Sequence, residues 1–206
     1  MVSKVDWRIQ RRSGIAAIAA SMAISAALWF ALYHFLRPLA GVESIGARML
    51  VALKCTVLAT LFCFVAGIEA VAHERLQSDA FDPLAGHQSK RLAVNLRYLQ
   101  NTLEQLVVLA VGLFGLAAYL TSSEAMRALP ATTVVWVLNR FAFWIGYHRS
   151  AALRGLGAPS MAIGLIVLLY VAARVGSDVA GSIGGAIVIL AFLALEAVLF
   201  WKTRST

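Results

Sequence analysis

Six mostly apolar stretches, several of them about as long as a bilayer is thick, constrain the fold of this chain more than any other feature. A transmembrane helix needs roughly 20 apolar residues, at about 1.5 Å of rise per residue. Apolar residues make up 61% of the 206 residues and charged residues only 14%. The six stretches are residues 14–36, 46–72, 92–120, 130–149, 156–175 and 180–201. The sequence therefore predicts a multi-pass integral membrane protein.

These stretches are expected to be α-helices, because backbone polar groups inside a bilayer must be paired within the protein. A closed β-barrel would need alternating apolar and polar residues, which the stretches lack. The first stretch is longer than the ~7–15 apolar residues of a signal peptide, so we interpret it as a retained span. Cys55 and Cys63 fit neither a redox motif nor a metal site, and we expect buried free thiols and no bound metal.

The basic residues predict the orientation of the bundle. The formal net charge is +8, but the basic residues gather at the ends of apolar stretches, which favours topology over nucleic-acid binding. With the N-terminus inside, the internal segments carry Lys4, Arg8, Arg11, Arg12, Arg75, Lys90, Arg91, Arg149, Arg154, Lys202 and Arg204, and the external segments carry Arg37, Arg48, Arg127 and Arg174. This asymmetry predicts two cytoplasmic termini and an even number of spans, four or six, in the inner membrane of a bacterium.

Charged and amide side chains within the third stretch need an explanation. Arg97, Asn101 and Glu104 are spaced by four and then three residues, so they share one helix face. A lone charge in hydrocarbon costs a few kcal/mol, and such residues therefore face protein or a water-filled cavity. They indicate either a structural polar clasp or a functional site.

The fourth stretch carries a second polar set. Arg140, Tyr147 and Arg154 are seven residues apart, close to two helical turns, and they line one stripe if the helix continues that far. Tyr147 alone could be an interfacial anchor. Together, the two sets predict a cationic, half-buried site at the cytoplasmic ends of two helices. Arginine pairs with carboxylates and Glu104 with an ammonium group, so a small peptide with excess carboxylates fits the site.

The stretches "RYLQNTLEQL" and "RFAFWIGYHRSAALRGLG" carry a family resemblance. The first resembles the R-x3-N-x2-E signature of the MAPEG family, the membrane-associated proteins of eicosanoid and glutathione metabolism. The second resembles that family's third-helix block, and "GYHRSAALR" is close to the leukotriene-forming glutathione transferases. The resemblance covers roughly residues 46–175. It implies a four-helix core there, with extra membrane helices within residues 1–45 and 176–206.

The resemblance also implies a function. Family members are homotrimers that bind glutathione as co-substrate near the cytoplasmic face, between subunits. Arg97, Asn101, Glu104, Arg140 and Tyr147 match glutathione-binding positions. Arg154, together with Tyr147, matches the catalytic positions, where an arginine stabilises the thiolate. A cation beside a thiol lowers its pKa from about 8.5, and the thiolate is the nucleophile. The implied activity is attack on lipophilic electrophiles or reduction of hydroperoxides.

Three departures from the family pattern keep alternatives open. No proline follows Glu104, Phe143 stands where relatives often have Tyr or His, and Gln100 replaces the arginine of the prostaglandin-forming branch. Arg75 is a further candidate for acting on the thiol. The main alternative is a non-catalytic protein of the same fold that binds a lipid or small ligand for a partner. A transporter is a third possibility, although paired discontinuous helices are not evident.

Overall fold

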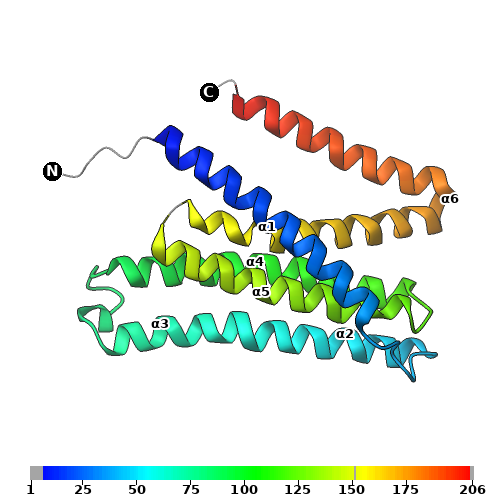
Figure 1. Cartoon of the computed structure of the whole chain (residues 1–206), viewed down its shortest axis with the longest axis horizontal. Helices are drawn as coiled ribbons and strands as arrows, with labels where there is room; N and C mark the ends of the chain where they lie inside the picture. The colour runs from blue at the N-terminus through cyan, green and yellow to red at the C-terminus, as the bar shows by residue number, and fades with distance from the viewer. Residues whose placement is uncertain (1–6, 151, 205–206) are drawn as a thin grey trace.

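The computed structural model describes residues 7–150 and 152–204, and every regular element among them is a helix. This confirms the predicted all-α membrane fold. In chain order (Figure 1) the elements are α1 (Trp7–Phe35), α2 (Ile45–Ala59), η1 (Thr60–Val65), α3 (Ala66–Leu76), η2 (Asp79–Phe81), α4 (Lys90–Tyr119), η3 (Ala125–Arg127), α5 (Ala128–Arg149), η4 (Leu153–Gly157) and α6 (Ala158–Arg204).

Five helical segments of the described chain are long and apolar enough to cross a membrane. They are Gln10–Phe35, Ile45–Leu76, Lys90–Tyr119, Ala125–Arg149 and Leu153–Thr203. The second combines α2, the π-helix η1 and α3 into one uninterrupted segment. Serine caps begin two of the helices: Ser44 Oγ accepts from the Ala47 N–H, and Ser89 Oγ accepts from the Leu92 N–H. The protein is thus a multi-pass integral membrane protein.

The last two predicted stretches, residues 156–175 and 180–201, correspond to the two halves of α6, which folds back at a kink between them. Figure 1 shows its two halves running in opposite directions. Only Ala180 and Gly181 leave helical geometry at this kink. Gly181 has φ 62°, a left-handed conformation that favours glycine. A Cβ at Gly176 would lie 2.7 Å from the Gly184 carbonyl oxygen, so the halves pack backbone to backbone.

The two ends of the bundle differ in charge. Both described ends of the chain lie at the same end of the bundle as the α3–α4 connection and the α5–η4 turn (Figure 1). We name it the basic end, because its segments carry Arg11, Arg12, Lys90, Arg91, Arg149 and Lys202. The other end, with the α1–α2 and α4–α5 connections, is the opposite end. Lys4, and the side chains of Arg8 and Arg204, lie outside the described residues.

The buried core lies between α2, α4, α5 and the first half of α6. Its largest fully buried apolar side chains include Trp136, Leu109, Leu113 and Met126. A Cβ on Gly112 would lie 2.8 Å from a Val167 methyl carbon, so small residues bring α4 and α6 close together. Cys55 and Cys63 are buried and free, as predicted. The second half of α6 is largely exposed, and Figure 1 shows it beside the bundle rather than within it.

Candidate functional site

Helix α4 presents the first predicted set to one cavity of about 410 Å³, which we name the polar site. Arg97, Asn101 and Glu104 all line it, because α4 runs unbroken through these positions and the four-and-three spacing keeps them on one face. The volume falls in the usual range for small-ligand pockets, about 300–1,000 Å³. The arrangement fits a functional site better than a clasp, since Arg97 and Glu104 are exposed to the cavity rather than paired with a neighbouring helix.

Tyr147 and Arg154 line the same cavity from the other side. The expectation that one continuous helix carries both is wrong: α5 ends at Arg149, and Arg154 lies in the short 3₁₀ helix η4. The chain becomes extended at Ser150 and then turns back, with the Leu153 N–H donating to Ser150 Oγ at 3.2 Å. The turn places the Arg154 guanidinium 6.0 Å from the centre of the Tyr147 ring.

Two glycines allow η4 to fold back onto α5. A Cβ on Gly146 would collide with the backbone carbonyl of Leu153, and a Cβ on Gly157 would collide with Phe143. Both glycines are buried, so the absence of a side chain lets backbone pack against backbone. The "GYHR" and "RGLG" stretches are therefore needed to deliver Arg154, a role that sequence reasoning did not assign to them.

The remaining predicted residue, Arg140, is fully buried behind Asn101 and does not line the cavity. Its Nη1 donates to Asn101 Oδ1 at 2.9 Å, and its Nη2 donates to Thr102 Oγ1 at 2.7 Å. The guanidinium also lies over the Phe143 ring, 4.6 Å from its centre. Arg140 therefore fixes the orientation of Asn101 rather than reaching into the cavity.

Further residues that support the site were missed from the sequence. The Gln105 amide donates to Asn101 Oδ1 at 3.1 Å, and Ser160 Oγ donates to Gln105 Oε1 at 2.7 Å. The Gln105–Asn101 bond lies within α4, at i, i+4 spacing, whereas the Ser160–Gln105 bond ties α4 to the first turn of α6. The second bond joins residues 55 positions apart, so no local spacing could have indicated it.

A ring platform and a π-helix lie on the core side of Arg140. Tyr98 is fully buried and stacks on Trp144, with ring centres 4.5 Å apart. Its hydroxyl donates to the Cys63 carbonyl at 3.1 Å, within η1, and π-helical turns often occur beside functional sites. The guanidinium of Arg140 lies 5.2 Å from the centre of the Tyr98 ring. The packed rings hold this buried cation in one place.

The electrostatics of the polar site favour an anionic ligand. Within the described part of the chain, neither Arg97 nor Arg154 forms an ion pair, and Glu104 accepts a hydrogen bond only from Gln100, at 3.3 Å. The Arg140 Nε is buried without a hydrogen-bond partner among the described residues. Arg97 and Arg154 are exposed and line the cavity, so both can bind a carboxylate there, whereas Arg140 is buried and does not line it.

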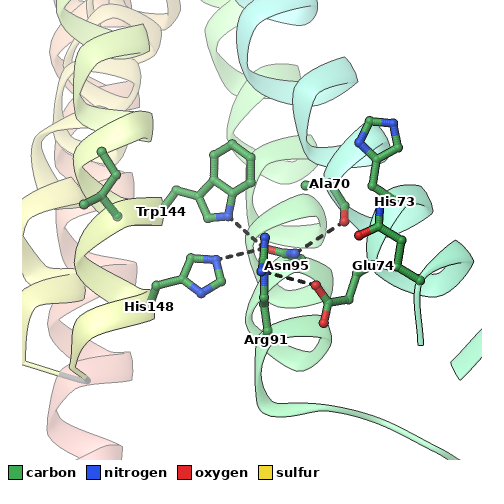
Figure 2. A pocket seen from close by; sticks show the side chains of 9 residues that line it. Ala70, His73, Glu74, Arg91, Asn95, Trp144 and His148 are labelled. Atoms are coloured by element: carbon green, nitrogen blue, oxygen red, sulfur yellow. Dashed lines mark hydrogen bonds and ion pairs between the residues drawn. The ribbon is translucent and has the colours of Figure 1, made fainter. Parts of the chain in front are cut away.

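A second polar cavity, of about 390 Å³, lies between α3, α4 and α5 (Figure 2). Asn95 is at its centre: Oδ1 accepts from Trp144 Nε1 at 2.9 Å and lies 2.9 Å from His148 Nε2. The Asn95 amide points toward the Ala70 carbonyl, at 3.5 Å. One amide thus connects three helices, and its hydrogen-bonding groups are already used.

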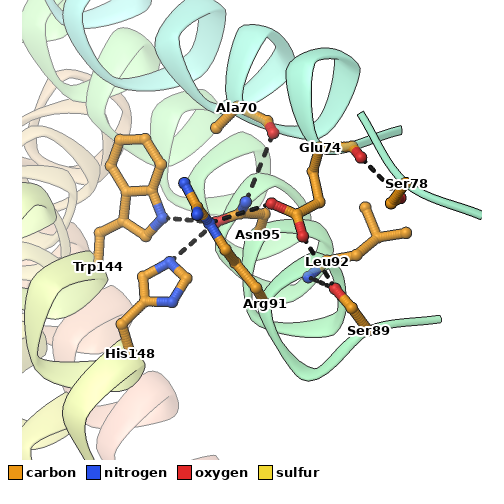
Figure 3. Close-up of polar contacts among 9 residues, drawn as sticks. All are labelled: Ala70, Glu74, Ser78, Ser89, Arg91, Leu92, Asn95, Trp144 and His148. Atoms are coloured by element: carbon orange, nitrogen blue, oxygen red, sulfur yellow. Dashed lines mark hydrogen bonds and ion pairs between the residues drawn. The ribbon is translucent and has the colours of Figure 1, made fainter. Parts of the chain in front are cut away.

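The outer edge of this cavity is closed by a second group of contacts, which Figure 3 shows. Arg91 Nε lies 3.0 Å from Glu74 Oε2, and Ser89 Oγ donates to Glu74 Oε1 at 3.0 Å. His73 is exposed and lies 3.5 Å from Glu69. Because these groups pair with one another, the cavity is a clasp between helices. No group of three His, Cys, Asp or Glu residues suited to a metal occurs in the described residues.

Comparisons with known proteins cover the polar site. The MAPEG family model matches residues 49–177, a range that contains α4, α5, η4 and the first half of α6 up to Ser177. Transmembrane protein 79 from Bos taurus is 24% identical over 144 residues, which cover 69% of this chain and 36% of that protein. The chain thus spans about a third of this relative's length. No solved structure matches the chain significantly. Helix α1 lies outside the matched family range.

Proposed function

Because this chain belongs to the MAPEG family, we propose that its polar site binds glutathione and that the protein is a membrane-bound glutathione transferase or peroxidase. The family includes glutathione-dependent enzymes. Glutathione enters from the basic end, and a lipophilic electrophile or hydroperoxide arrives from the bilayer. The observation that carries the proposal is the excess of arginines without carboxylate partners around one small cavity.

The residues of α4 bind the peptide. Arg97, which is free of ion pairs among the described residues, takes a glutathione carboxylate through its planar fork. Glu104 takes the ammonium group. Asn101, held in place by Arg140 and Gln105, offers its amide donors to the peptide backbone.

Arg154 and Tyr147 activate the sulfur. A guanidinium beside the thiol favours its deprotonated form, and Tyr147, which lies against the same guanidinium, can donate a hydrogen bond from its hydroxyl to the thiolate. With an aryl halide, the thiolate forms a carbon–sulfur bond and halide leaves, while the thiol proton passes to solvent. With a hydroperoxide, two glutathione thiols are oxidised to the disulfide, and the hydroperoxide is reduced to an alcohol and water.

The proposal includes an assembly and an orientation. The resemblance to the family implies a homotrimer, with neighbouring subunits completing the glutathione site. The excess of basic residues at the basic end favours a cytoplasmic location for that end and for both termini.

The test begins with binding. Millimolar glutathione should raise the thermal unfolding temperature of the detergent-solubilised protein, because a ligand stabilises the folded state by RT ln(1 + [L]/Kd). Arg154→Ala should reduce turnover of a generic aryl halide far more than it weakens glutathione binding. Arg149→Ala is the matched control, since Arg149 is exposed and does not line the cavity. Wild-type turnover in Arg154→Ala would remove the proposed role.

A second function is favoured by two residues of the cavity wall. Both line the polar site: Phe143 stands where relatives often carry Tyr or His, and Gln100 stands where the prostaglandin-forming branch carries arginine. The family also includes non-catalytic members. In this alternative, the site binds a small ligand for a partner protein. Stabilisation by glutathione without turnover of any aryl halide or hydroperoxide would favour it over the enzyme.

A further inference from the structure

A second large cavity of different character lies on the side of the bundle covered by α1. It is an elongated space of about 530 Å³ between α1, α4, α5 and the first half of α6, and we name it the apolar groove. Its walls include Met22, Trp29 and Tyr33 from α1, and Pro159 and Tyr170 from α6. Helix α1 precedes the range matched by the family, so this groove does not follow from family membership.

The polar atoms on the floor of the groove are already paired. Trp29 Nε1 donates to Thr132 Oγ1 at 3.0 Å. Ser25 Oγ and the Asn139 side-chain amide bond to each other at 2.9 Å. The remaining wall is almost entirely hydrocarbon, so a polar ligand would lose its hydrogen bonds to water without replacement. The occupant must therefore be apolar along this length.

The length of the groove matches one leaflet of a bilayer. From Met22 to Tyr33 and from Pro159 to Tyr170, each wall rises about 16 Å at 1.5 Å per residue. Half of the hydrocarbon core of a bilayer is about 15 Å. In Figure 1, α1 and the first half of α6 both run from the basic end toward the opposite end. The groove thus follows the direction in which a lipid chain lies.

The groove is open sideways and ends in a polar mouth. Phe30 and Ile166 on its two walls are 58% and 63% exposed, so a chain can enter from the bilayer. Near Tyr33, toward the opposite end of the bundle, the Arg127 guanidinium lies 5.2 Å from the centre of the Tyr33 ring. Its Nε and Nη1 donate to the carbonyls of Glu124 and Leu36, so among the described residues Nη2 is the nitrogen left for a phosphate. Tyrosines and arginines are the residues that face lipid headgroups, and arginine pairs with phosphate.

From these features we propose that the apolar groove holds one acyl chain of a phospholipid, drawn from the leaflet at the opposite end, with its phosphate beside Arg127. The surrounding bilayer supplies this phospholipid, and the positive charge of Arg127 complements its negative phosphate. The inner end of the groove, at Pro159, is next to Ala158 of the polar site, so an occupied groove supports the turn that separates the two cavities.

The test uses a phospholipid with a photoactivatable diazirine in the middle of one chain, incorporated in liposomes with the full chain. Mass spectrometry should find Ala162, Ile163 and Ile166 labelled severalfold more than Leu53 and Val57, which are exposed on the outer face of α2. Equal labelling of the two faces would overturn the proposal, because it would mean ordinary contact with bulk lipid. Absence of groove labelling together with cross-links between copies across the groove would also overturn it, in favour of a second copy as occupant.

Variants of the groove and of its end at Arg127 sharpen the test. Ala162→Phe fills the groove and should reduce labelling of Ile166 severalfold, whereas Leu53→Phe on the α2 face should not. If Ala162→Phe does not fold, Ala128→Leu narrows the groove from the α5 wall and carries the same expectation.

A diacylglycerol with the same photoactivatable chain tests the headgroup: wild type should prefer the phospholipid, and Arg127→Gln should remove that preference. An unchanged preference in Arg127→Gln would overturn the assignment of the phosphate.

Discussion

The polar site and the apolar groove are walled by the same helices, yet they suit opposite ligands. Residues of α4, α5 and α6 line both, and Ala158 in one cavity is adjacent to Pro159 in the other, in the first turn of α6. The groove also contains polar side chains, but Trp29 and Thr132 bond to each other. In the polar site, Arg97 and Arg154 have no ion-pair partner among the described residues. The character of a cavity in a membrane bundle thus depends on which polar atoms are already paired, more than on how many there are.

The largest effect should come from the buried cation behind the polar site. Arg140→Leu leaves Asn101 and Thr102 without their shared donor and opens space against the aromatic rings. Losing a buried charged hydrogen-bond network costs about 3 kcal/mol, so both the free energy of unfolding and glutathione binding should fall. Denaturation in mixed detergent micelles measures the first, and ligand-induced thermal stabilisation measures the second.

The matched control is Arg91→Leu. Arg91 is paired with Glu74, but its side chain is 74% exposed, and surface ion pairs contribute about 0–1 kcal/mol. If both variants are equally stable, or if Arg140→Leu still binds glutathione as wild type does, then Arg140 does not organise the polar site.

The next effect concerns the turn that delivers Arg154. Gly157→Ala forces a methyl group into Phe143, and overpacking of this kind costs typically about 1–3 kcal/mol. Because η4 must shift, turnover should fall along with stability, while the α4 half of the site remains intact. Thermal unfolding and aryl halide turnover measure the two effects.

Gly46→Ala is the control for this variant, since a Cβ at Gly46 has no neighbour within 4 Å. It should be neutral or slightly stabilising, because alanine has the higher helix propensity. Full activity in Gly157→Ala would show that the position of η4 does not matter for Arg154.

These two sets of variants also mark what the sequence could and could not predict. The i, i+4, i+7 spacing of Arg97, Asn101 and Glu104 is a local property of one helix, and it correctly predicted a shared face. Apolar length likewise predicted the spans. The position of Arg154 was predicted for the wrong reason, because a seven-residue period assumed a continuous helix. What replaced the helix is a turn that depends on Gly146 and Gly157, through contacts with Leu153 and Phe143.

The sequence also could not predict tertiary contacts, because they join residues that lie far apart in the chain. Arg48 was assigned only to an external segment, yet it is buried and donates to the carbonyls of Ala117 and Glu43. Asn95 likewise bonds to Trp144 and His148, which lie about fifty residues away in the chain. A single sequence shows which side chains are costly to bury, but it does not show which distant atoms satisfy them.

A smaller effect should come from the contact between α1 and the turn. A Cβ on Gly155 would lie 3.0 Å from Ile18 and 3.1 Å from the Gly14 carbonyl, so Gly155→Leu should push α1 away from η4. Stability should fall by about 1–2 kcal/mol, and labelling of the groove should weaken because α1 forms one of its walls. Glutathione binding by α4 should persist. Loss of glutathione binding together with unchanged labelling of the groove would contradict the proposal that α1 serves the apolar groove and α4 serves the polar site.

The smallest effect concerns the paired polar atoms of the groove floor. Trp29→Phe removes the hydrogen bond to Thr132 and keeps a ring in the wall. Hydrogen bonds between membrane helices contribute about 0.6 kcal/mol on average, and a double-mutant cycle with Thr132→Val isolates that energy from the loss of packing. The cycle should give a coupling of this size in the unfolding free energy. A coupling of zero would mean that water or a ligand already satisfies these atoms. The polar atoms of the apolar groove would then not be paired within the protein, and the contrast with the polar site, where unpaired polar atoms are kept for a ligand, would not hold.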